Sequence, residues 1–354
     1  MCIRDSADTG ATTTVTASGQ QPVWSPDGSR LAWNEASEDG FAIVSVGADF
    51  SDRFEAPTPF FGYYGYWDPT STRLAMLGNA FPGTGLVLDE GVEQPLEVVG
   101  ADGFYFFSWS PDGLRWVVRG TGGLRIADPS GDGPVIELDL ASASVPIWTP
   151  DNRIIVAVRS GDGADVVAID PVSLDQSVLF STGDITRMVL DPTGRYLAVE
   201  TIEVLPPGQS GIQEVAFRQQ PEFASTILVH DLATSATSEA NDGGALAMWW
   251  SPSGSHLAML VPGANSQLRW VWWTHDGTVT AGESHRITPF YASTYLPFYD
   301  QFAQSVTPWS SDGQRFAYAG VSASGAGVFV DTIGDDVGPV LVSSTGDVAI
   351  WAPG

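Results

Sequence analysis

A short turn motif recurs along the whole chain, and it constrains the fold more than any other feature. Residues 24–33 read WSPDGSRLAW: an aromatic residue, a Ser-Pro-Asp-Gly turn and a second apolar strand. Pro fixes φ at about −65°, Ser and Asp hydrogen-bond back to the nearby backbone, and Gly closes the turn without a steric penalty. Each copy of the motif therefore predicts two strands joined by a tight turn.

The copies follow one another at a regular spacing. The residues that mark their starts are Trp24, Trp67, Trp109, Trp148, Leu190, Trp250, Trp309 and Trp351. The intervals are 43, 42, 39, 42, 60, 59 and 42 residues, and most are close to the ~40–45-residue period of a four-stranded propeller blade. In seven copies a small residue stands eight positions after the marker, preceded by a larger apolar one: Ala32, Ala75, Val117, Val156, Ala198, Ala258 and Ala317.

Strands that are apolar on both faces must be covered on both sides, so the repeats are expected to stack against one another. The predicted fold is all-β, a β-propeller of four-stranded antiparallel blades. Eight motif starts, with the last cut short, favour eight blades with a truncated last blade; seven blades are the alternative.

The chain is expected to form a single propeller domain over residues 7–354. Its blades are expected to begin near residues 22, 64, 106, 146, 187, 247, 306 and 348. Residues 1–6, MCIRDS, look like a non-native leader and are excluded from the fold prediction. The β-branched run Thr12–Ala17 is expected to form the outermost strand of a blade whose other strands come from the C-terminal end.

These residues resemble a known family, the TolB-type WD40-like propeller repeat. Its signature is a W-S-P-D-G turn followed by a short L-A-aromatic strand, and Trp24–Trp33, 109–113 and 250–259 match it most closely. The resemblance covers essentially the whole chain and implies an extracytoplasmic setting, periplasmic or at the cell surface, although no signal peptide is visible. Such blades occur in periplasmic scaffold proteins and in propeller domains of peptidases, so the resemblance leaves the function open.

The charge of the chain excludes some classes of partner. It has 42 acidic residues against 15 basic ones, all Arg, and a net charge of −27. Such a field repels phosphate backbones and anionic lipid, so neither nucleic acid nor a membrane surface is expected as a partner. No apolar run approaches the ~18 residues of a membrane span, and a monomer is expected. We interpret the acidity as a solubility feature, with cation binding as the alternative.

No catalytic residue, metal ligand or cofactor is predicted. The four His lie outside HxxxH and HExxH patterns, the only Cys is Cys2, and no G-x-S-x-G is present. Residues 128–133, DPSGDG, lack the spaced ligands of an EF-hand and are interpreted as a polar hairpin turn. Arg30, Arg73, Arg115 and Arg315, with His256, share one motif position, where pairing with Asp residues of adjacent turns is favoured over an acidic partner.

Two insertions break the regular spacing. Glu203–Phe223 is expected to join the second and third strands of the fifth blade, and Thr288–Ser305 is expected to link the sixth blade to the seventh, after a fourth strand at about Thr278–Ile287. An up-and-down strand order places both insertions on the face opposite the Ser-Pro-Asp-Gly turns. We therefore expect any recognition site on that insertion face.

Thr288–Ser305 is unusually aromatic, and long loops in compact domains are usually functional or disordered. Tyr residues combine apolar area with a hydroxyl, a mixture found in recognition surfaces. The candidate binding residues are Phe290, Tyr291, Tyr295, Phe298, Tyr299, Asp300 and Gln301. On the residues alone, a plug, in which the loop folds over the channel mouth and packs its own aromatic side chains, is favoured over a binding loop.

The leading hypothesis is a non-catalytic extracytoplasmic scaffold that binds a protein, peptide or glycan through the insertion face. The alternative is the gating propeller domain of a prolyl-oligopeptidase-like serine peptidase, whose hydrolase domain lies outside this chain. A third possibility is a propeller enzyme that uses carboxylates and a metal ion in its channel. The sequence contains no feature that identifies a ligand.

Overall fold

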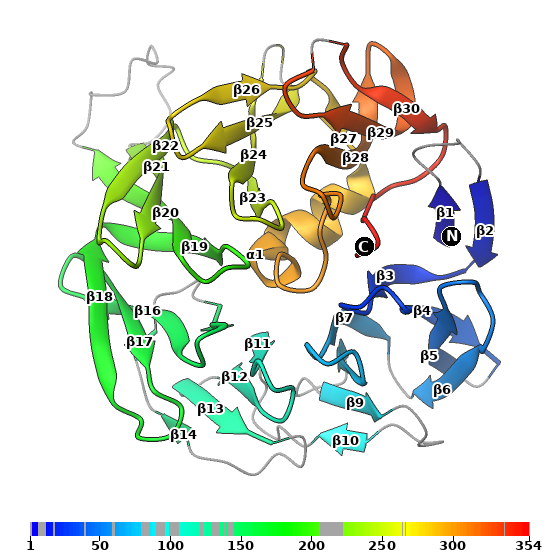
Figure 1. Cartoon of the computed structure of the whole chain (residues 1–354), viewed down its shortest axis with the longest axis horizontal. Helices are drawn as coiled ribbons and strands as arrows, with labels where there is room; N and C mark the ends of the chain where they lie inside the picture. The colour runs from blue at the N-terminus through cyan, green and yellow to red at the C-terminus, as the bar shows by residue number, and fades with distance from the viewer. Residues whose placement is uncertain are drawn as a thin grey trace.

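The computed structural model shows a ring of β-sheets around a central axis (Figure 1). It describes residues 2–5, 12–16, 18–38, 40–58, 61–78, 85–89, 96–98, 106–120, 123–128, 135–136, 139–140, 145–205, 222–263, 265, 267–335 and 337–353. These residues form seven four-stranded antiparallel sheets and one two-stranded sheet. The chain is therefore a β-propeller with repeated antiparallel blades, as the motif predicts.

Within each four-stranded sheet the strands pair in chain order, and the first strand lies nearest the axis. The first three sheets are β3 (Gln20–Trp24), β4 (Arg30–Ser37), β5 (Gly40–Gly47) and β6 (Phe54–Thr58); β7 (Gly62–Trp67), β8 (Arg73–Gly78), β9 (Gly85–Asp89) and β10 (Leu96–Val98); and β11 (Phe106–Trp109), β12 (Trp116–Gly120), β13 (Gly123–Ala127) and β14 (Val135–Ile136). The fourth and fifth are β15 (Ile147–Trp148), β16 (Ile154–Ser160), β17 (Gly163–Ile169) and β18 (Gln176–Thr182); and β19 (Asp184–Leu190), β20 (Tyr196–Leu205), β21 (Glu222–Asp231) and β22 (Thr237–Asp242).

The sixth sheet contains β23 (Ala247–Trp250), β24 (His256–Pro262), β25 (Leu268–Thr274) and β26 (Val279–Ala281). The seventh contains β27 (Arg286–Ile287), β28 (Arg315–Ser322), β29 (Gly325–Thr332) and β30 (Val340–Ser343). The two-stranded sheet contains β1 (Cys2–Asp5) and β2 (Thr12–Thr16), and it lies between the seventh and first sheets (Figure 1).

Neither predicted number of blades describes this ring. The eighth motif, at Trp351, forms no strand among the described residues, so the prediction of a truncated eighth blade that starts there is wrong. Its place in the ring is taken by β1 and β2, so the ring is not seven equal blades either. Residues 2–5, which were expected to belong to a non-native leader, pair with β2.

The repeated turn forms for the reason that the sequence suggests. In the first copy the buried Ser25 hydroxyl donates to the Asp27 carboxylate (2.7 Å) and accepts from the Arg30 backbone N–H (2.9 Å). Gly28 adopts φ +68° and its N–H donates to the Ser25 carbonyl. Ser110 and Ser310 make the same bonds in their own turns. The hydrogen bonds that close each turn are therefore made within the motif itself.

The marker Trp side chains join one sheet to the one before it. The indole N–H of Trp109 donates to the carbonyl of Tyr66 (3.0 Å), and that of Trp309 donates to the carbonyl of Trp249 (3.1 Å). The small residues of the motif, such as Ala32 and Ala258, are fully buried between sheets. The core is therefore divided into layers between neighbouring blades, as the two-sided apolar pattern predicts.

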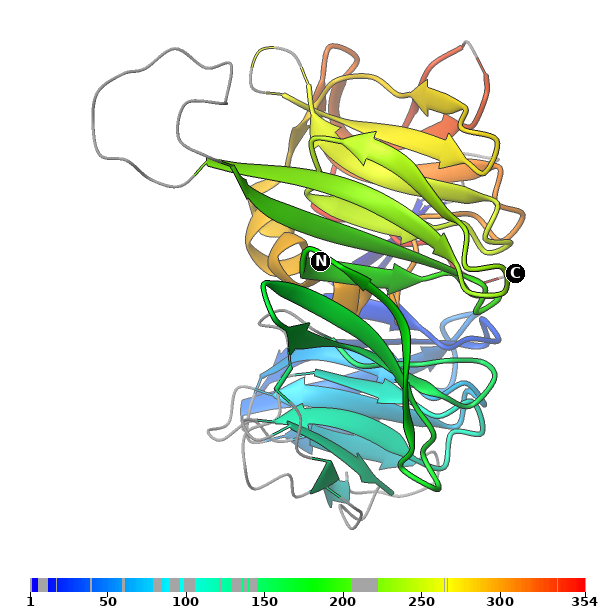
Figure 2. The ribbon, with the colours of Figure 1, turned by 90° about the vertical axis from the view of Figure 1, so that its left-hand side faces the viewer.

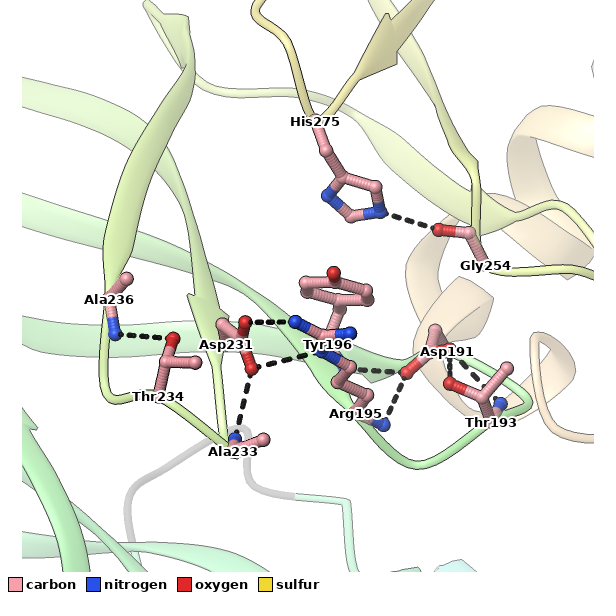
Figure 3. A network of polar contacts seen from close by, with 10 residues as sticks. All are labelled: Asp191, Thr193, Arg195, Tyr196, Asp231, Ala233, Thr234, Ala236, Gly254 and His275. Carbon is pink, nitrogen blue, oxygen red and sulfur yellow. Dashed lines mark hydrogen bonds and ion pairs between the residues drawn. The ribbon is translucent and has the colours of Figure 1, made fainter.

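The motif Arg positions are used inside the fold. In the fifth copy Tyr196 occupies this position, and Arg195 stands one residue before it. Figure 3 shows Arg195 paired with Asp231 of the same sheet (2.8 Å), next to an aromatic stack of Tyr196 on His275 of the sixth sheet, whose Nε2 donates to the Gly254 carbonyl. Elsewhere the guanidinium groups of Arg115 and Arg315 lie over the marker rings of the next motif, Trp148 and Trp351. Arg115 and Arg315 therefore join neighbouring repeats, whereas Arg195 pairs within its own sheet.

The start of the seventh sheet differs from the sequence prediction. Residues 278–287 were expected to form one fourth strand, but β26 ends at Ala281 and β27 already pairs with β28 of the next sheet. The innermost strand of the seventh sheet is then interrupted and resumes near Trp309, which bridges to Phe316. The expectation that Thr288–Ser305 links two blades is therefore wrong, because the insertion lies within the first strand of the seventh blade.

Candidate functional site

The insertion at residues 288–306, called the plug segment below, folds into short helical turns. A π-helical turn (Tyr291–Tyr295), a 3-10 turn (Leu296–Phe298) and α1 (Tyr299–Phe302) follow one another directly. Figure 1 shows α1 in the middle of the ring, and Figure 2 places the helical turns on one side of the disc, opposite the tight turns. Residues 206–221 of the other predicted insertion lie outside the described residues.

Most aromatic side chains of the plug segment face inward. Tyr295, Tyr299 and Phe302 are 1–5% exposed. The Phe302 ring packs on Tyr295 (4.3 Å between centroids) and on Tyr64 of β7 (5.2 Å). On the other side of the segment, Tyr299 contacts Trp249 of β23. These contacts make the plug segment part of the core.

Gln301 fixes the segment to the innermost strand of the third sheet. Its side-chain Oε1 accepts from the Phe107 N–H (3.1 Å), and its Nε2 donates to the Phe107 carbonyl (2.9 Å). The Tyr64 hydroxyl donates to the Gln301 backbone carbonyl (3.0 Å). Since Gln301 is 2% exposed, its side chain satisfies two backbone groups of a strand edge that faces the channel.

Asp300 is a buried carboxylate at the centre of the ring, 3% exposed. The Arg187 Nε lies 3.7 Å from its Oδ1, and the Gln301 N–H donates to the same oxygen (3.2 Å). Burial raises the pKa of Asp300 to about 7, although the charges of Arg187 and Arg119 act in the opposite direction. Arg187 also donates to the Pro297 carbonyl (3.2 Å).

The Gln304 side chain also donates to the carbonyl of Pro146, just before β15 (3.2 Å). Taken together, these contacts reach the inner edges of five sheets, the second to the sixth. The partners are Tyr64, Phe107, Pro146, Arg187 and Trp249. This is the arrangement that the plug alternative predicts. Of the predicted binding residues, Tyr295, Tyr299, Asp300 and Gln301 are buried, whereas Phe290 and Tyr291 are partly buried.

Phe298 is the exception, because 48% of it is exposed. Its ring lies 6.4 Å from that of Phe106, and the Arg119 guanidinium lies over the Phe106 ring at 5.7 Å. Arg187 lies close to Phe298, because it donates to the carbonyl of the preceding residue, Pro297. Phe106, Arg119, Arg187 and Phe298 are called the mouth cluster below.

A small cavity lies behind the plug segment. Its volume is about 30 Å³, and it lies where the innermost strand of the seventh sheet is interrupted. Tyr291 and Tyr295 close it on the plug side, and residues 348–350 close it on another. Trp249, Trp270, His285 and Tyr318 form its remaining aromatic wall. The cavity therefore brings together residues from the sixth and seventh sheets.

The sequence analysis did not identify the other members of these two sites. Arg119 lies near the end of β12 and Arg187 near the start of β19, which are the strand ends that meet the insertion face. The predicted strand order could have placed them there. Trp249, Trp270, His285 and Tyr318 carry no local signal, because the interruption of β27 brings them together. In the described part of the chain, no three His, Cys, Asp or Glu side chains are grouped to hold a metal ion.

Comparison with known proteins identifies the fold. No protein-family model matches the chain, and no curated protein matches it. Among solved structures, it is similar to an oligogalacturonate lyase in complex with manganese (14% identity, TM-score 0.60, 95% of this chain and 96% of that one). An oligogalacturonate lyase from Vibrio parahaemolyticus gives 11% identity and a TM-score of 0.60, covering 94% and 96%.

TolB from Acinetobacter baumannii is also among the similar structures, with 15% identity and a TM-score of 0.46 over 75% of this chain. The matched region spans 66% of that TolB. The predicted resemblance to TolB-like propellers is thus confirmed among the structural neighbours. In the described residues no helix has both the length and the apolar character to cross a membrane. At these identities the likeness shows the fold alone: a β-propeller with repeated blades.

Proposed function

We propose that the protein is a non-catalytic, extracytoplasmic β-propeller scaffold that binds a protein, peptide or glycan at the mouth cluster. The observation that carries the proposal is the exposure of Phe298 on a segment whose other anchors are buried. The extracytoplasmic setting rests on the resemblance to TolB-like repeats. Of the candidate binding residues in the insertion, the proposal keeps Phe298, which is exposed.

The chemistry of the mouth cluster suits recognition. Aromatic and Arg side chains carry most of the energy in many interfaces. Here the exposed Phe298 ring lies beside Phe106, with Arg119 and Arg187 around it. The plug segment is held by Gln301 and by packed Tyr and Phe rings, so Phe298 needs little further ordering when a partner binds.

The plug segment also bears on the peptidase alternative. A gating propeller would guide a substrate through the ring, whereas here the plug segment contacts the inner edges of five sheets. Because the plug segment fills the centre of the ring, we favour recognition of a partner on the insertion face over passage of a substrate through the channel. The oligogalacturonate lyases share the fold, but no described residue favours their reaction over simple binding.

The test is a binding screen of the purified protein against a peptide library and a glycan array. We expect Phe298→Ala to reduce capture of any selected partner at least tenfold while the melting temperature changes little, because Phe298 is half exposed. Val178→Ala is the matched control, since Val178 is 58% exposed on β18, an outermost strand away from the ring centre. Capture that survives Phe298→Ala, or that falls equally in Val178→Ala, would contradict the proposal.

A further inference from the structure

The mouth cluster combines an exposed aromatic ring with two cations. The Arg119 guanidinium lies over the Phe106 ring (5.7 Å), and that ring lies 6.4 Å from the ring of Phe298. On the other side, Arg187 donates to the carbonyl of Pro297, the residue before Phe298 (3.2 Å). Phe298 is 48% exposed, and the other members of the cluster are partly exposed. A partner that packs on Phe298 is therefore within reach of two Arg side chains.

The two cations of the cluster share one buried carboxyl group. The Arg187 Nε lies 3.7 Å from the Asp300 Oδ1, and the charge of Arg119 also acts on Asp300. Because burial raises the pKa of Asp300 to about 7, this carboxyl is ionised in only about half of the molecules at neutral pH. Burial also lowers the pKa of Arg119, although Asp300 acts in the opposite direction. Among the described residues, the cluster therefore carries more positive than negative charge.

Glu200, the cross-strand neighbour of Arg187, points away from the cluster. Its carboxylate accepts from the hydroxyls of Thr186 (2.8 Å) and Ser225 (2.9 Å), and Ser225 lies on β21, farther from the ring centre (Figure 1). Arg187 instead reaches the plug segment, and its ion pair in the described part of the chain is with Asp300. The charge of Glu200 is therefore directed to the outer strands and not to the mouth cluster.

Arg187 keeps donors for a further acceptor. Its guanidinium has five N–H groups. Within the described residues, the carbonyls of Thr186 and Pro297 take one N–H from each terminal nitrogen, and the Nε faces Asp300. One N–H on each terminal nitrogen remains, and 28% of the side chain is exposed. A carboxylate can accept from such a pair of N–H groups.

We propose that the mouth cluster binds the C-terminal carboxylate of a peptide or protein chain whose last residue has a large apolar side chain. The carboxylate accepts from Arg187 and Arg119, and the last side chain packs on Phe298. Hydrogen bonds from Arg to a carboxylate are charge-assisted and directional, so they fix the end of the partner chain. This inference rests on the function proposed above, because it names the partner of the same site.

The cluster suits a chain end better than a sugar acid. A uronic acid also carries a carboxylate, but its ring hydroxyls require further hydrogen bonds. Apart from the two guanidinium groups, the cluster offers only the phenyl rings of Phe106 and Phe298. The nearby Gln301 side chain already bonds both backbone groups of Phe107. An apolar side chain next to a single carboxylate therefore matches the cluster more closely.

The net charge of the chain restricts the partner to a single anionic group. A net charge of −27 repels polyanions such as nucleic acid or an anionic lipid surface. At physiological ionic strength, exposed charges farther than about 8 Å are largely screened. One carboxylate is therefore governed by the charges of the mouth cluster, whereas an extended polyanion also meets the acidic surface around it.

The test compares two probes that differ only in charge, N-acetyl-L-phenylalanine and its neutral amide, by isothermal titration at pH 7 in about 0.15 M salt. We expect the acid to bind in a saturable manner with a Kd on the order of millimolar, as suits so small a molecule. It should bind about tenfold more tightly than the amide, the worth of a charge-assisted hydrogen bond. Equal binding of acid and amide would overturn the proposal.

Two further probes test the apolar part and the class of partner. Acetate has the carboxylate without the ring, and glucuronate has the carboxylate on a sugar. Both should bind at least about tenfold more weakly than N-acetyl-L-phenylalanine, because neither packs on Phe298. If acetate bound as tightly, the apolar side chain would contribute nothing. If glucuronate bound as tightly, the site would select a sugar acid. Either result would overturn the proposal.

Arg119→Gln should weaken binding of the acid about tenfold and leave binding of the amide within about twofold. Arg159→Gln is the matched control. Arg119 and Arg159 both stand next to last in the second strand of their sheets, β12 and β16, but Arg159 pairs with Asp139 (3.8 Å) and is 60% exposed. Both variants lose one positive charge. An equal effect of the two variants would reveal a general charge effect and would overturn the proposal.

A partner selected in the binding screen separates this inference from the proposed function. Amidation of its C-terminus should reduce capture at least about tenfold. Capture that survives amidation but is lost in Phe298→Ala would overturn this inference and leave the proposed function in place. Capture that survives Phe298→Ala would contradict the proposed function itself. The titrations of the unsubstituted protein with the acid and the amide decide the inference even if a variant does not fold.

Discussion

Each Ser-Pro-Asp-Gly turn contacts the neighbouring blade as well as closing its own hairpin. Gly113 has φ +67°, and a Cβ placed on it would overlap the Asp68 carboxylate, the residue that begins the preceding turn. Gly254 lies against Asp191 in the same way. The glycine of the motif is therefore needed for two reasons: its left-handed backbone conformation and the close approach of the preceding turn.

Gly113→Ala should lower the free energy of unfolding by about 2–4 kcal/mol, because the left-handed conformation and the overlap with Asp68 both add to the cost. Gly161→Ala is the control: Gly161 has φ +59° but no heavy atom within 4 Å of the added Cβ, so only the conformational cost of about 1 kcal/mol remains. Urea unfolding of both variants measures the difference. Equal losses would show that the contact with Asp68 contributes nothing.

At the scale of elements, the plug segment completes sheets whose inner edges would otherwise face the channel. Gln301 supplies both hydrogen bonds to the Phe107 backbone, and Gln304 donates to the Pro146 carbonyl (3.2 Å) from a partly buried position. The Gln301 contact is buried and has two hydrogen bonds, whereas the Gln304 contact has one. Loss of the Gln301 side chain leaves two backbone groups of Phe107 unpaired, whereas loss of the Gln304 side chain leaves one carbonyl, that of Pro146.

Gln301→Ala should destabilise the protein by about 2–5 kcal/mol, because two buried backbone groups of Phe107 lose their partner. Gln304→Ala should cost about 1 kcal/mol or less. Chemical denaturation followed by Trp fluorescence compares the variants. If Gln301→Ala were as mild as Gln304→Ala, the plug segment would not be fixed to β11 as the structure shows.

At the scale of the whole molecule, a titratable carboxyl lies buried at the centre of an acidic ring. The pKa of Asp300 is raised from 3.8 to about 7 by burial. Between these values the folded state binds more protons than the unfolded state, so this group makes the protein less stable as pH rises from about 4 to 7. The shift corresponds to at most about 4 kcal/mol.

We therefore expect Asp300→Asn to reduce the loss of stability between pH 5 and pH 8. The asparagine is close to the aspartate in size and has no charge to desolvate. Thermal unfolding across this pH range, compared with the unsubstituted protein, measures the effect; Asp331→Asn is the parallel variant, since burial raises the pKa of Asp331 to about 6. An unchanged pH profile in Asp300→Asn would show that Asp300 stays ionised through its contact with Arg187.

The sequence by itself determined the repeating unit. The Ser-Pro-Asp-Gly turn is local, since Ser25, Asp27 and Arg30 bond within a few residues of one another. The alternation of large and small apolar residues determined that the sheets stack on both faces, and Ala32 and Leu31 are buried as expected. Turn chemistry and strand periodicity act over short separations, so they can be predicted from one sequence.

Only the tertiary structure decided the number of four-stranded sheets and the role of the insertion. The aromatic residues of 288–306 are compatible with a binding loop or a plug, and long-range partners such as Tyr64 and Phe107 place Gln301 and Phe302 in the centre. Phe298 is exposed and Tyr295 is buried, although both are aromatic residues of the same short segment. Such contacts join residues about 200 positions apart, and no local pattern encodes them because burial depends on how the ring closes.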